Sequence, residues 1–181
     1  MRKLKLKMSM SLDGYVVGPD GDVEGWMGPS FDEQATEWVV NALWDADLHI
    51  MGTGVFREME ATWPISDLPF AEPMNEIDKL VFSQSLTSTT WAKASITRED
   101  IAAAIPRLKG ESGKDILAHG GPRFARSLSE ARLIDQYILL VHPVTLGGGE
   151  ALFPAGPPLH LTLRSVTPFP GGAMGLVYDR N

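Results

Sequence analysis

The sequence predicts an α/β domain built on a mostly parallel sheet, flanked by helices and ending in an antiparallel hairpin. Residues 114–153 show a strand at 115–119, a glycine turn, a helix and a second strand, which is the crossover unit of parallel sheets. The second strand is almost wholly apolar over residues 137–141, as expected where helices cover both faces. Two apolar runs at 159–166 and 175–179 flank a proline- and glycine-rich turn, which predicts the terminal hairpin.

Composition limits the function classes. A chain of 181 residues that is 44% hydrophobic is expected to form a single domain over residues 1–181. The net charge of −7 argues against a nucleic-acid surface, and the absence of cysteine excludes disulfides and thiol chemistry. No signal peptide, membrane span or metal-ligand spacing is recognisable, so we expect a cytoplasmic protein without a metal site.

The N-terminal third contains a strand, a long loop and a helix. Residues 4–10 alternate apolar and basic side chains, which predicts a strand at the edge or flank of the sheet. The glycine-rich residues 14–29 are expected to form a binding loop or lid. Ser30 and Glu33 have the spacing of a capping box, so the first helix is predicted to begin at Ser30.

The middle of the chain alternates short apolar runs with breakers. Further strands are predicted at residues 48–51, 79–82 and 91–96. Residues 61–73 carry three prolines and are expected to be irregular. Thr97 is predicted to cap a helix that runs to residue 108, and Pro106 should kink or shorten it. A loop is expected at residues 154–158.

Two glycine junctions carry the clearest functional signal. Gly120 and Gly121 end one strand, and Pro122 suits the first position of the following helix. Free N–H groups and the positive end of the helix dipole can receive a phosphate there. A plainer interpretation is that the glycines only close a strand–helix junction. The phosphate interpretation is favoured because a second junction, at Gly52, can face the same crevice.

Several motifs together resemble the dihydrofolate-reductase-like fold. They are residues 11–15 (SLDGY), 51–52 (MG), 81–83 (VFS), 115–117 (DIL) with 120–121 (GG), and 142–149 (HPVTLGGG). The chain is most similar to the branch related to the C-terminal reductase domain of the bifunctional deaminase-reductase of bacterial riboflavin biosynthesis. The resemblance covers nearly the whole chain.

The resemblance implies an NADPH-dependent reductase, with NADH as a possible substitute, acting on a pteridine- or pyrimidine-like heterocycle. It implies cofactor contacts from Gly52, Thr53, Gly54, Val55, Ser83, Ser85, Gly120, Gly121, Pro122, Arg123 and Phe124. It places Asp13, Tyr15 and Trp26 on the substrate side, and Glu37 and Asp13 as candidate catalytic residues. It further implies a cis peptide bond between Gly120 and Gly121, and a homodimer.

One stretch departs from the family pattern. Where relatives carry Gly-Arg-x-Thr, this chain has Thr53 and Val55 after Gly52. The missing arginine would have offered a bidentate cation to a phosphate. We therefore expect weak NADPH binding with little preference over NADH, unless another cation takes over. Arg57 and Arg98 are possible replacements that the sequence alone cannot place.

Alternatives remain open at several residues. Glu37 is either a proton donor or a solvated surface glutamate, and Asp13 either binds substrate or forms an Asx turn. His142 is expected to be a core histidine, whereas His119 borders the glycine turn. A nucleotide- or flavin-binding protein without turnover is the second functional hypothesis, and a dimerisation scaffold is the third.

The terminal strands also carry a signal for self-association. Their apolar side chains, which would need a partner if exposed, are Leu159, Leu161, Leu163, Leu176 and Val177. This row supports the homodimer expected from the resemblance. No nucleic-acid or membrane partner is expected.

Overall fold

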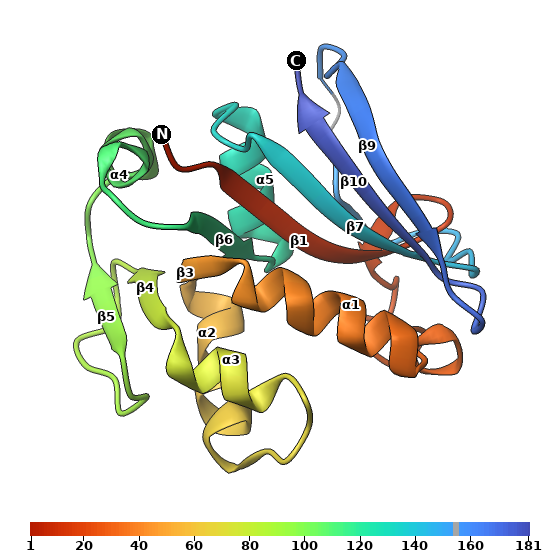
Figure 1. Cartoon of the computed structure of the whole chain (residues 1–181), viewed down its shortest axis with the longest axis horizontal. Coiled ribbons are helices and arrows are strands. Elements are labelled where there is room, and N and C mark those ends of the chain that lie inside the picture. The colour runs from red at the N-terminus through yellow and green to blue at the C-terminus, as the bar shows by residue number, and fades with distance from the viewer. Residues whose placement is uncertain (154–155) are drawn as a thin grey trace.

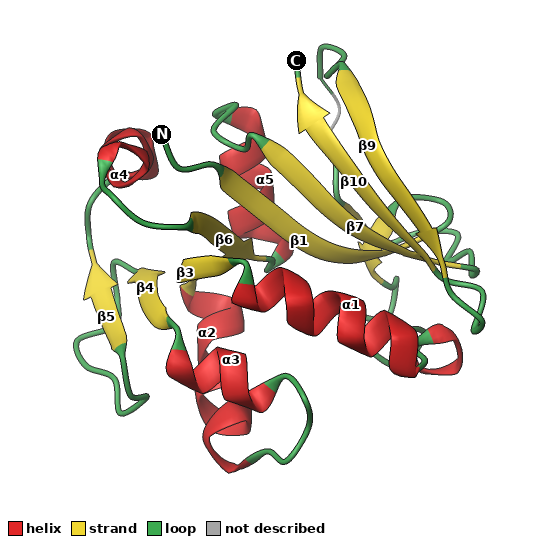
Figure 2. Ribbon diagram, viewed as in Figure 1, coloured by secondary structure: helices red, strands yellow, loops and turns green. Residues whose placement is uncertain are grey.

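The computed structural model describes residues 1–153 and 156–181 and shows a sheet with helices on both faces (Figures 1 and 2). The strands are β1 (Leu4–Ser11), β2 (Tyr15–Val17), β3 (Ala46–Gly52), β4 (Asp78–Phe82), β5 (Ala94–Thr97), β6 (Asp115–His119), β7 (Gln136–His142), β8 (Glu150–Ala151), β9 (Leu161–Pro168) and β10 (Met174–Arg180). The helices are α1 (Glu33–Trp44), α2 (Thr53–Thr62), α3 (Ala71–Glu76), α4 (Ile101–Gly110) and α5 (Pro122–Glu130), with 3₁₀ turns η1 (Gly28–Ser30) and η2 (Trp63–Ile65). In the described ranges no helix has the length and hydropathy needed to cross a membrane.

The main sheet has eight strands in the order β5-β4-β3-β6-β1-β7-β10-β9. The six strands from β5 to β7 are mutually parallel, whereas β10 runs antiparallel to both β7 and β9. A separate small sheet pairs β2 with β8. The predicted mixed sheet with a C-terminal antiparallel hairpin is therefore confirmed.

Each face of the sheet has its own apolar core. Helices α4 and α5 cover one face, where Ile105 and Leu128 pack with Leu6 of β1. Helices α1, α2 and α3 cover the other, where Val39 and Phe56 join a second buried cluster. This division follows from right-handed crossovers, because α1 and α2 connect strands in one direction along the sheet while α4 and α5 connect them in the other.

The expectation that residues 4–10 form an edge strand is wrong, because β1 lies between β6 and β7 at the centre of the sheet. Its basic residues are accommodated by partners from distant segments. Lys5 is only 7% exposed, and its Nζ lies 2.8 Å from Asp45 Oδ2 and 2.9 Å from Asp115 Oδ2. The alternation of charged and apolar residues therefore predicted a strand correctly, but it did not show whether the charged side chains are exposed to solvent.

Both predicted N-caps are also wrong. Helix α1 is capped by Asp32, whose Oδ1 accepts from Ala35 N at 2.8 Å. Ser30 instead belongs to η1, and its hydroxyl contacts a distant histidine. Helix α4 is capped by Asp100, because Thr97 is the last residue of β5. In each case the nearest later aspartate supplies the acceptor.

Other boundaries differ in smaller ways. Residues 61–73 are not wholly irregular, since they include the end of α2, the turn η2 and the start of α3. Helix α4 continues past Pro106 to Gly110. Strand β2 lies within the loop expected at 14–29. The loop expected at 154–158 includes residues 154 and 155, which lie outside the described residues.

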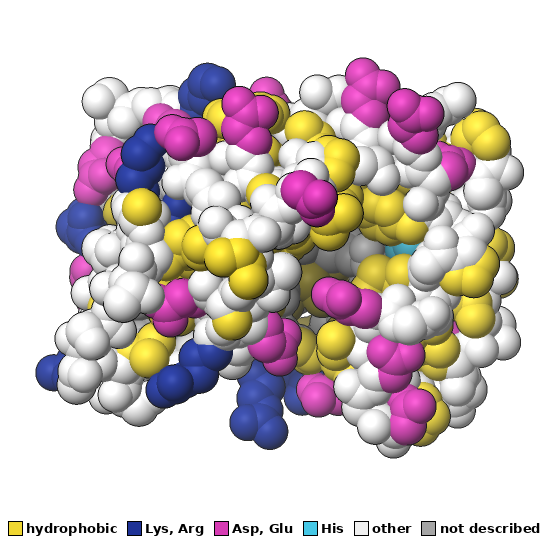
Figure 3. Space-filling model, turned by 90° about the horizontal axis from the view of Figure 1, so that it is seen from below, with side chains coloured by type: hydrophobic (Ala, Val, Ile, Leu, Met, Phe, Trp, Pro, Cys, Tyr) yellow, Lys and Arg dark blue, Asp and Glu magenta, His cyan; other side chains and the backbone are white. Residues whose placement is uncertain are grey.

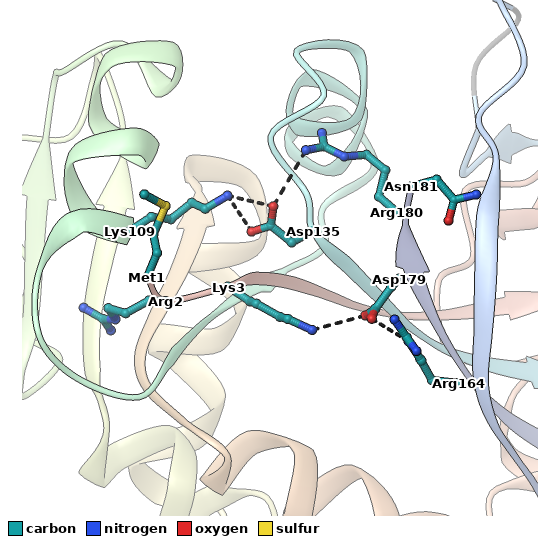
Figure 4. Close-up of a pocket in the computed structure, with 9 residues that line it drawn as sticks. All are labelled: Met1, Arg2, Lys3, Lys109, Asp135, Arg164, Asp179, Arg180 and Asn181. Carbon is teal, nitrogen blue, oxygen red and sulfur yellow. Dashed lines mark hydrogen bonds and ion pairs between the residues drawn. The ribbon is translucent and has the colours of Figure 1, made fainter.

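A charged depression of about 450 Å³ lies at the amino-terminal end of β1 (Figure 4). Lys109 Nζ lies 2.7 Å from Asp135 Oδ1, and Arg164 Nε lies 2.6 Å from Asp179 Oδ2. These pairs join α4, the start of β7 and the terminal hairpin. Because its carboxylates are engaged by neighbouring cations, we assign the depression a structural role.

We predict that Asp135→Asn weakens this end of the sheet. Asp135 Oδ2 accepts from Leu4 N at 2.8 Å while Oδ1 accepts from Lys109, so the substitution removes a charge-assisted bond. The free energy of unfolding in urea should fall by about 1.5–3 kcal/mol. Asp67→Asn, at an exposed position, is the matched control. Equal stability of the two variants would contradict the assignment.

Candidate functional site

The two predicted glycine junctions meet at the carboxyl ends of β3 and β6. These strands are neighbours, yet β3 leads into α2 on one face of the sheet and β6 into α5 on the other. Such a switch point leaves a crevice beyond the strand ends. A Cβ built on Gly121 would lie 3.6 Å from Val55 Cβ, and one on Gly52 would lie 3.1 Å from Phe124 Cβ. The two junctions therefore face each other.

Both helix N-termini at this crevice lack side-chain caps. The N-cap residues are Gly52 for α2 and Gly121 for α5, and neither first turn contains an acidic residue. The N–H groups of the first turn have no intrahelical acceptors and carry the positive end of the helix dipole. Two such termini, brought together from opposite faces, form a site suited to an anion with two phosphate groups.

The two glycines of the 120–121 pair have different roles. A Cβ on Gly120 would lie 1.6 Å from Met8 Sδ, so the packing of Met8 leaves no room for a side chain at position 120. A Cβ on Gly121 would meet only ordinary contacts, so its backbone borders the crevice. The expected cis bond between them is wrong, since every peptide bond of the described residues is trans. The backbone of Gly121 is extended (φ −110°, ψ 142°) and leads into α5 through a trans peptide bond.

The predicted adenosine-side serines lie at the end of β4. Ser83 is 4% exposed, and its hydroxyl accepts from Leu86 N at 2.9 Å and from Ser85 N at 3.3 Å. That hydroxyl therefore closes the turn after β4. Ser85 is exposed and leaves its own hydroxyl toward solvent. Of the two, Ser85 is the better placed to contact a ligand.

Lys7, which sequence reasoning missed, lies with His119 on the α1 face of the sheet. Lys7 pairs in register with His119, the last residue of β6, so both lie near the glycine junction. Burial lowers the pKa of Lys7 to about 8, partly offset by Glu24. His119 is 4% exposed, and its ring centroid lies 4.6 Å from that of His49. Among the described residues, His119 Nε2 and His49 Nδ1 are buried without a hydrogen-bond partner.

The Asp13 carboxylate joins two loops through hydrogen bonds. Its carboxylate accepts from Ser11 Oγ at 2.6 Å, Leu146 N at 3.1 Å and Gly147 N at 2.8 Å. The hydrogen bond from Ser11, with those from the two backbone amides, holds the pKa of Asp13 below its ordinary value. The carboxylate thus fixes the turn before β2 against the connection after β7. Tyr15, the first residue of β2, is half-buried beside this turn.

Trp26 and His142 pack together where the loop at 14–29 closes on β7. Their ring centroids lie 5.4 Å apart in an edge-to-face arrangement, and His142 Nδ1 lies 2.7 Å from Ser30 Oγ. His142 is fully buried, as predicted, but the prediction of a satisfied core histidine is only partly correct, because its Nε2 has no hydrogen-bond partner in the described ranges. Seen from the side of α2 and α3, the surface is hollowed near its middle, with apolar side chains on its walls and acidic side chains at its rim (Figure 3).

Glu37 lies on the exposed side of α1, whose buried side is formed by Ala35, Val39 and Leu43. Its assignment as a proton donor stays a prediction, and Lys7 is nearer to the glycine junction. In the described part of the chain, no three histidines and carboxylates are grouped to hold a metal ion.

The buried histidines predict a specific loss of stability in mild acid. Burial lowers the pKa of His49 and of His142 to about 4, and that of His119 well below 6.5. The unfolded chain binds these protons near pH 6.5 but the folded chain does not. The free energy of unfolding should therefore fall as pH drops from about 6.5 toward 4, by up to about 1.4 kcal/mol per pH unit for each histidine.

Urea unfolding across this range measures the effect, and His142→Gln should reduce the slope. His160→Gln, at an exposed position, should not. A slope that appears only below about pH 4 would assign the effect to carboxylates.

Comparisons with known proteins identify the family and the fold. A family model described as RibD C-terminal domain matches residues 2–174. The uncharacterized protein YyaP of Bacillus subtilis (strain 168) is 28% identical over 187 residues, covering 99% of this chain and 96% of the relative. A Shewanella sp. PV-4 protein assigned to riboflavin biosynthesis superposes with a TM-score of 0.79 at 19% identity, covering 99% of each chain.

A second solved structure is the diaminohydroxyphosphoribosylaminopyrimidine deaminase/5-amino-6-(5-phosphoribosylamino)uracil reductase of Thermotoga maritima. It superposes with a TM-score of 0.71 at 13% identity, and the match covers 99% of this chain but 57% of that protein. The similarity of folds therefore extends over one part of the larger protein. Because the family model spans residues 2–174, the chain belongs to the RibD C-terminal domain family.

Proposed function

We propose that this protein is a reductase that uses NADPH or NADH to reduce a pyrimidine- or pteridine-like heterocycle. The observation that carries the proposal is the pair of uncapped helix N-termini facing each other at the β3–β6 switch point. The family membership supports it, and the uracil reductase of Thermotoga maritima supports a pyrimidine as the substrate class.

A dinucleotide would bind across the two helix N-termini. The bare backbone of Gly121 and the first turn of α5, from Pro122 to Phe124, form one side of the phosphate site. The first turn of α2, from Thr53 to Val55, forms the other. The nicotinamide group would supply the hydride, while the protein supplies orientation and a closed pocket.

Lys7 and His119 would form the substrate side of the site. A lysine with a pKa of about 8 is mostly protonated at neutral pH, yet it gives up a proton more readily than an exposed lysine. Its ammonium can donate to a carbonyl or ring nitrogen of the heterocycle. His119 is held neutral by burial, and its unpartnered Nε2 offers a second polar contact. Tyr15 and Trp26 would cover the substrate from the loop.

A second candidate function is dinucleotide or flavin binding without turnover. The observation that favours it is the first turn of α2, where Thr53 stands in place of the arginine that relatives carry. Binding and turnover measured separately distinguish the two functions. Binding together with consumption of NADPH by some member of a pyrimidine and pteridine panel supports the reductase. Binding without consumption across that panel supports the second function.

Gly121→Val tests the phosphate site. Its branched side chain would fill the space between Gly121 and Val55, so NADPH affinity should fall at least about tenfold, or 1.4 kcal/mol. Titration followed by tryptophan fluorescence measures this. Gly110→Val is the matched control, because no atom lies within 4 Å of a Cβ at Gly110, at the far end of α4. Equal affinity of Gly121→Val and parent would remove the phosphate assignment.

We also propose a homodimer formed through the terminal hairpin. Leu163 and Val166 of β9 are each 49% exposed, and Met174 of β10 is 38% exposed. The register pairs Val166 with Leu176 and Leu163 with Tyr178, which places these apolar side chains on one face. β9 is the edge strand of the sheet, so this face can continue across a two-fold axis.

Leu163→Arg should convert the dimer to a monomer, because it places a charge at the centre of the apolar face. Light scattering at micromolar concentration measures the mass. Ser165→Arg, which introduces the same charge on the other face of β9, should leave the dimer intact. A monomeric parent would contradict the proposal.

A further inference from the structure

Arg98 is an exposed cation whose charge is not used within the fold. In the described part of the chain no carboxylate oxygen lies within 4 Å of its guanidinium, although the chain carries a net charge of −7. The two acidic residues that follow it are engaged elsewhere. Glu99 pairs with Arg107 at 2.8 Å, and the Asp100 carboxylate accepts from Ala102 N as the cap of α4.

The backbone of Arg98 is held at the carboxyl end of the sheet. β5 pairs in parallel with β4, so Thr97 lies beside Phe82. Ser83 N donates to Thr97 O at 3.0 Å, and Gln84 Nε2 donates to Arg98 O at 3.0 Å. These bonds fix Arg98 next to the turn that carries the exposed hydroxyl of Ser85.

The crevice is open on this side and covered on the other. Toward β1 and β7, the loop at 14–29 closes over the strand ends. Leu152 N donates to Gly14 O at 3.1 Å, and Asp13 binds the amides of Leu146 and Gly147. Toward β4 and β5, both Ser85 and Arg98 are exposed. A dinucleotide whose phosphates lie at the β3–β6 junction can therefore extend its adenosine half toward β5.

The distance from the β3–β6 junction to Arg98 suits the adenosine half of a dinucleotide. β5 lies two strands from β3, so Arg98 begins roughly 10 Å from Gly52 along the sheet edge. Two other arginines near the crevice have no ion pair in the described ranges. Arg57 lies four residues after Thr53 and therefore about 6 Å farther down α2 from that edge. Arg123 is exposed in the first turn of α5, at the phosphate site itself. Of the three, Arg98 is the one that lies beside the turn after β4.

We propose that Arg98 selects NADPH over NADH by binding the 2′-phosphate, with the Ser85 hydroxyl as a second donor. The guanidinium of Arg98 binds this phosphate in place of the arginine that is missing at position 53. This inference rests on the proposed function, because it requires a dinucleotide at the β3–β6 junction. It adds a residue that determines cofactor specificity.

The test compares Arg98→Gln, Arg98→Lys and Arg57→Gln with the parent. Tryptophan fluorescence gives the affinities for NADPH and NADH, and calorimetry gives those for 2′,5′-ADP and 5′-ADP. The parent should prefer the phosphorylated member of each pair. Arg98→Gln should lower the affinity for NADPH and 2′,5′-ADP by roughly ten- to a hundredfold while leaving that for NADH and 5′-ADP unchanged. Arg98→Lys should restore part of the preference.

Arg132→Gln is the matched control, because it removes the same charge from an exposed site after the end of α5. It should change none of the four affinities. Equal NADPH and NADH affinities in the parent, or a preference abolished by Arg57→Gln and kept in Arg98→Gln, would overturn the inference and leave the proposed function standing. A parent that binds neither dinucleotide would overturn both.

Discussion

The approach of two strand–helix junctions at neighbouring strands is the constraint on which the site depends. β3 and β6 lie side by side, and the helices that follow them leave on opposite faces. Gly52 and Gly121 can therefore stand against Phe124 and Val55 with little space for further side chains. The two helices lack side-chain caps that typically contribute about 1 kcal/mol each. Their N–H groups remain available to a ligand instead.

Some polar residues in the middle of the sheet have hydrogen-bond or ion-pair partners within the protein, and others have none. Lys5 meets two carboxylates, and Lys79 Nζ donates to the carbonyls of Met74, Asn75 and Ile77 at 2.7–3.1 Å. These lysines hold the fold together. Lys7 has no carboxylate within 4 Å among the described residues, and His119 Nε2 has no hydrogen-bond partner there. An unpaired buried polar group costs stability, so we assign a ligand as the physical reason for His119 Nε2, with the half-buried Lys7 beside it.

The two ends of the sheet use charge differently. At the amino-terminal end, Asp135 and Asp179 engage the nearby cations and join segments distant in sequence. At the carboxyl end, Arg98 has no such partner in the described ranges, and the helix termini add further positive potential. An exposed, unpaired cation therefore lies at the end of the sheet where we propose that an anionic ligand binds. The depression of about 450 Å³ lies at the paired end, where we assign it a structural role.

The sequence by itself determined the features that depend on local chemistry. The strand at 115–119, the glycine pair and the helix that begins at Pro122 were predicted at the observed boundaries, because periodicity, Gly and Pro act over a few residues. Tertiary structure decided features that depend on distant partners. Ser30 contacts His142 rather than capping α1, and β1 is central because carboxylates from 45 and 115 accept Lys5.

The pairing of Lys7 with His119, and the placement of Arg98 beside the turn after β4, likewise depend on strand order and register. Strand order is set by which crossovers pack together, and that is a property of the whole core rather than of any one segment.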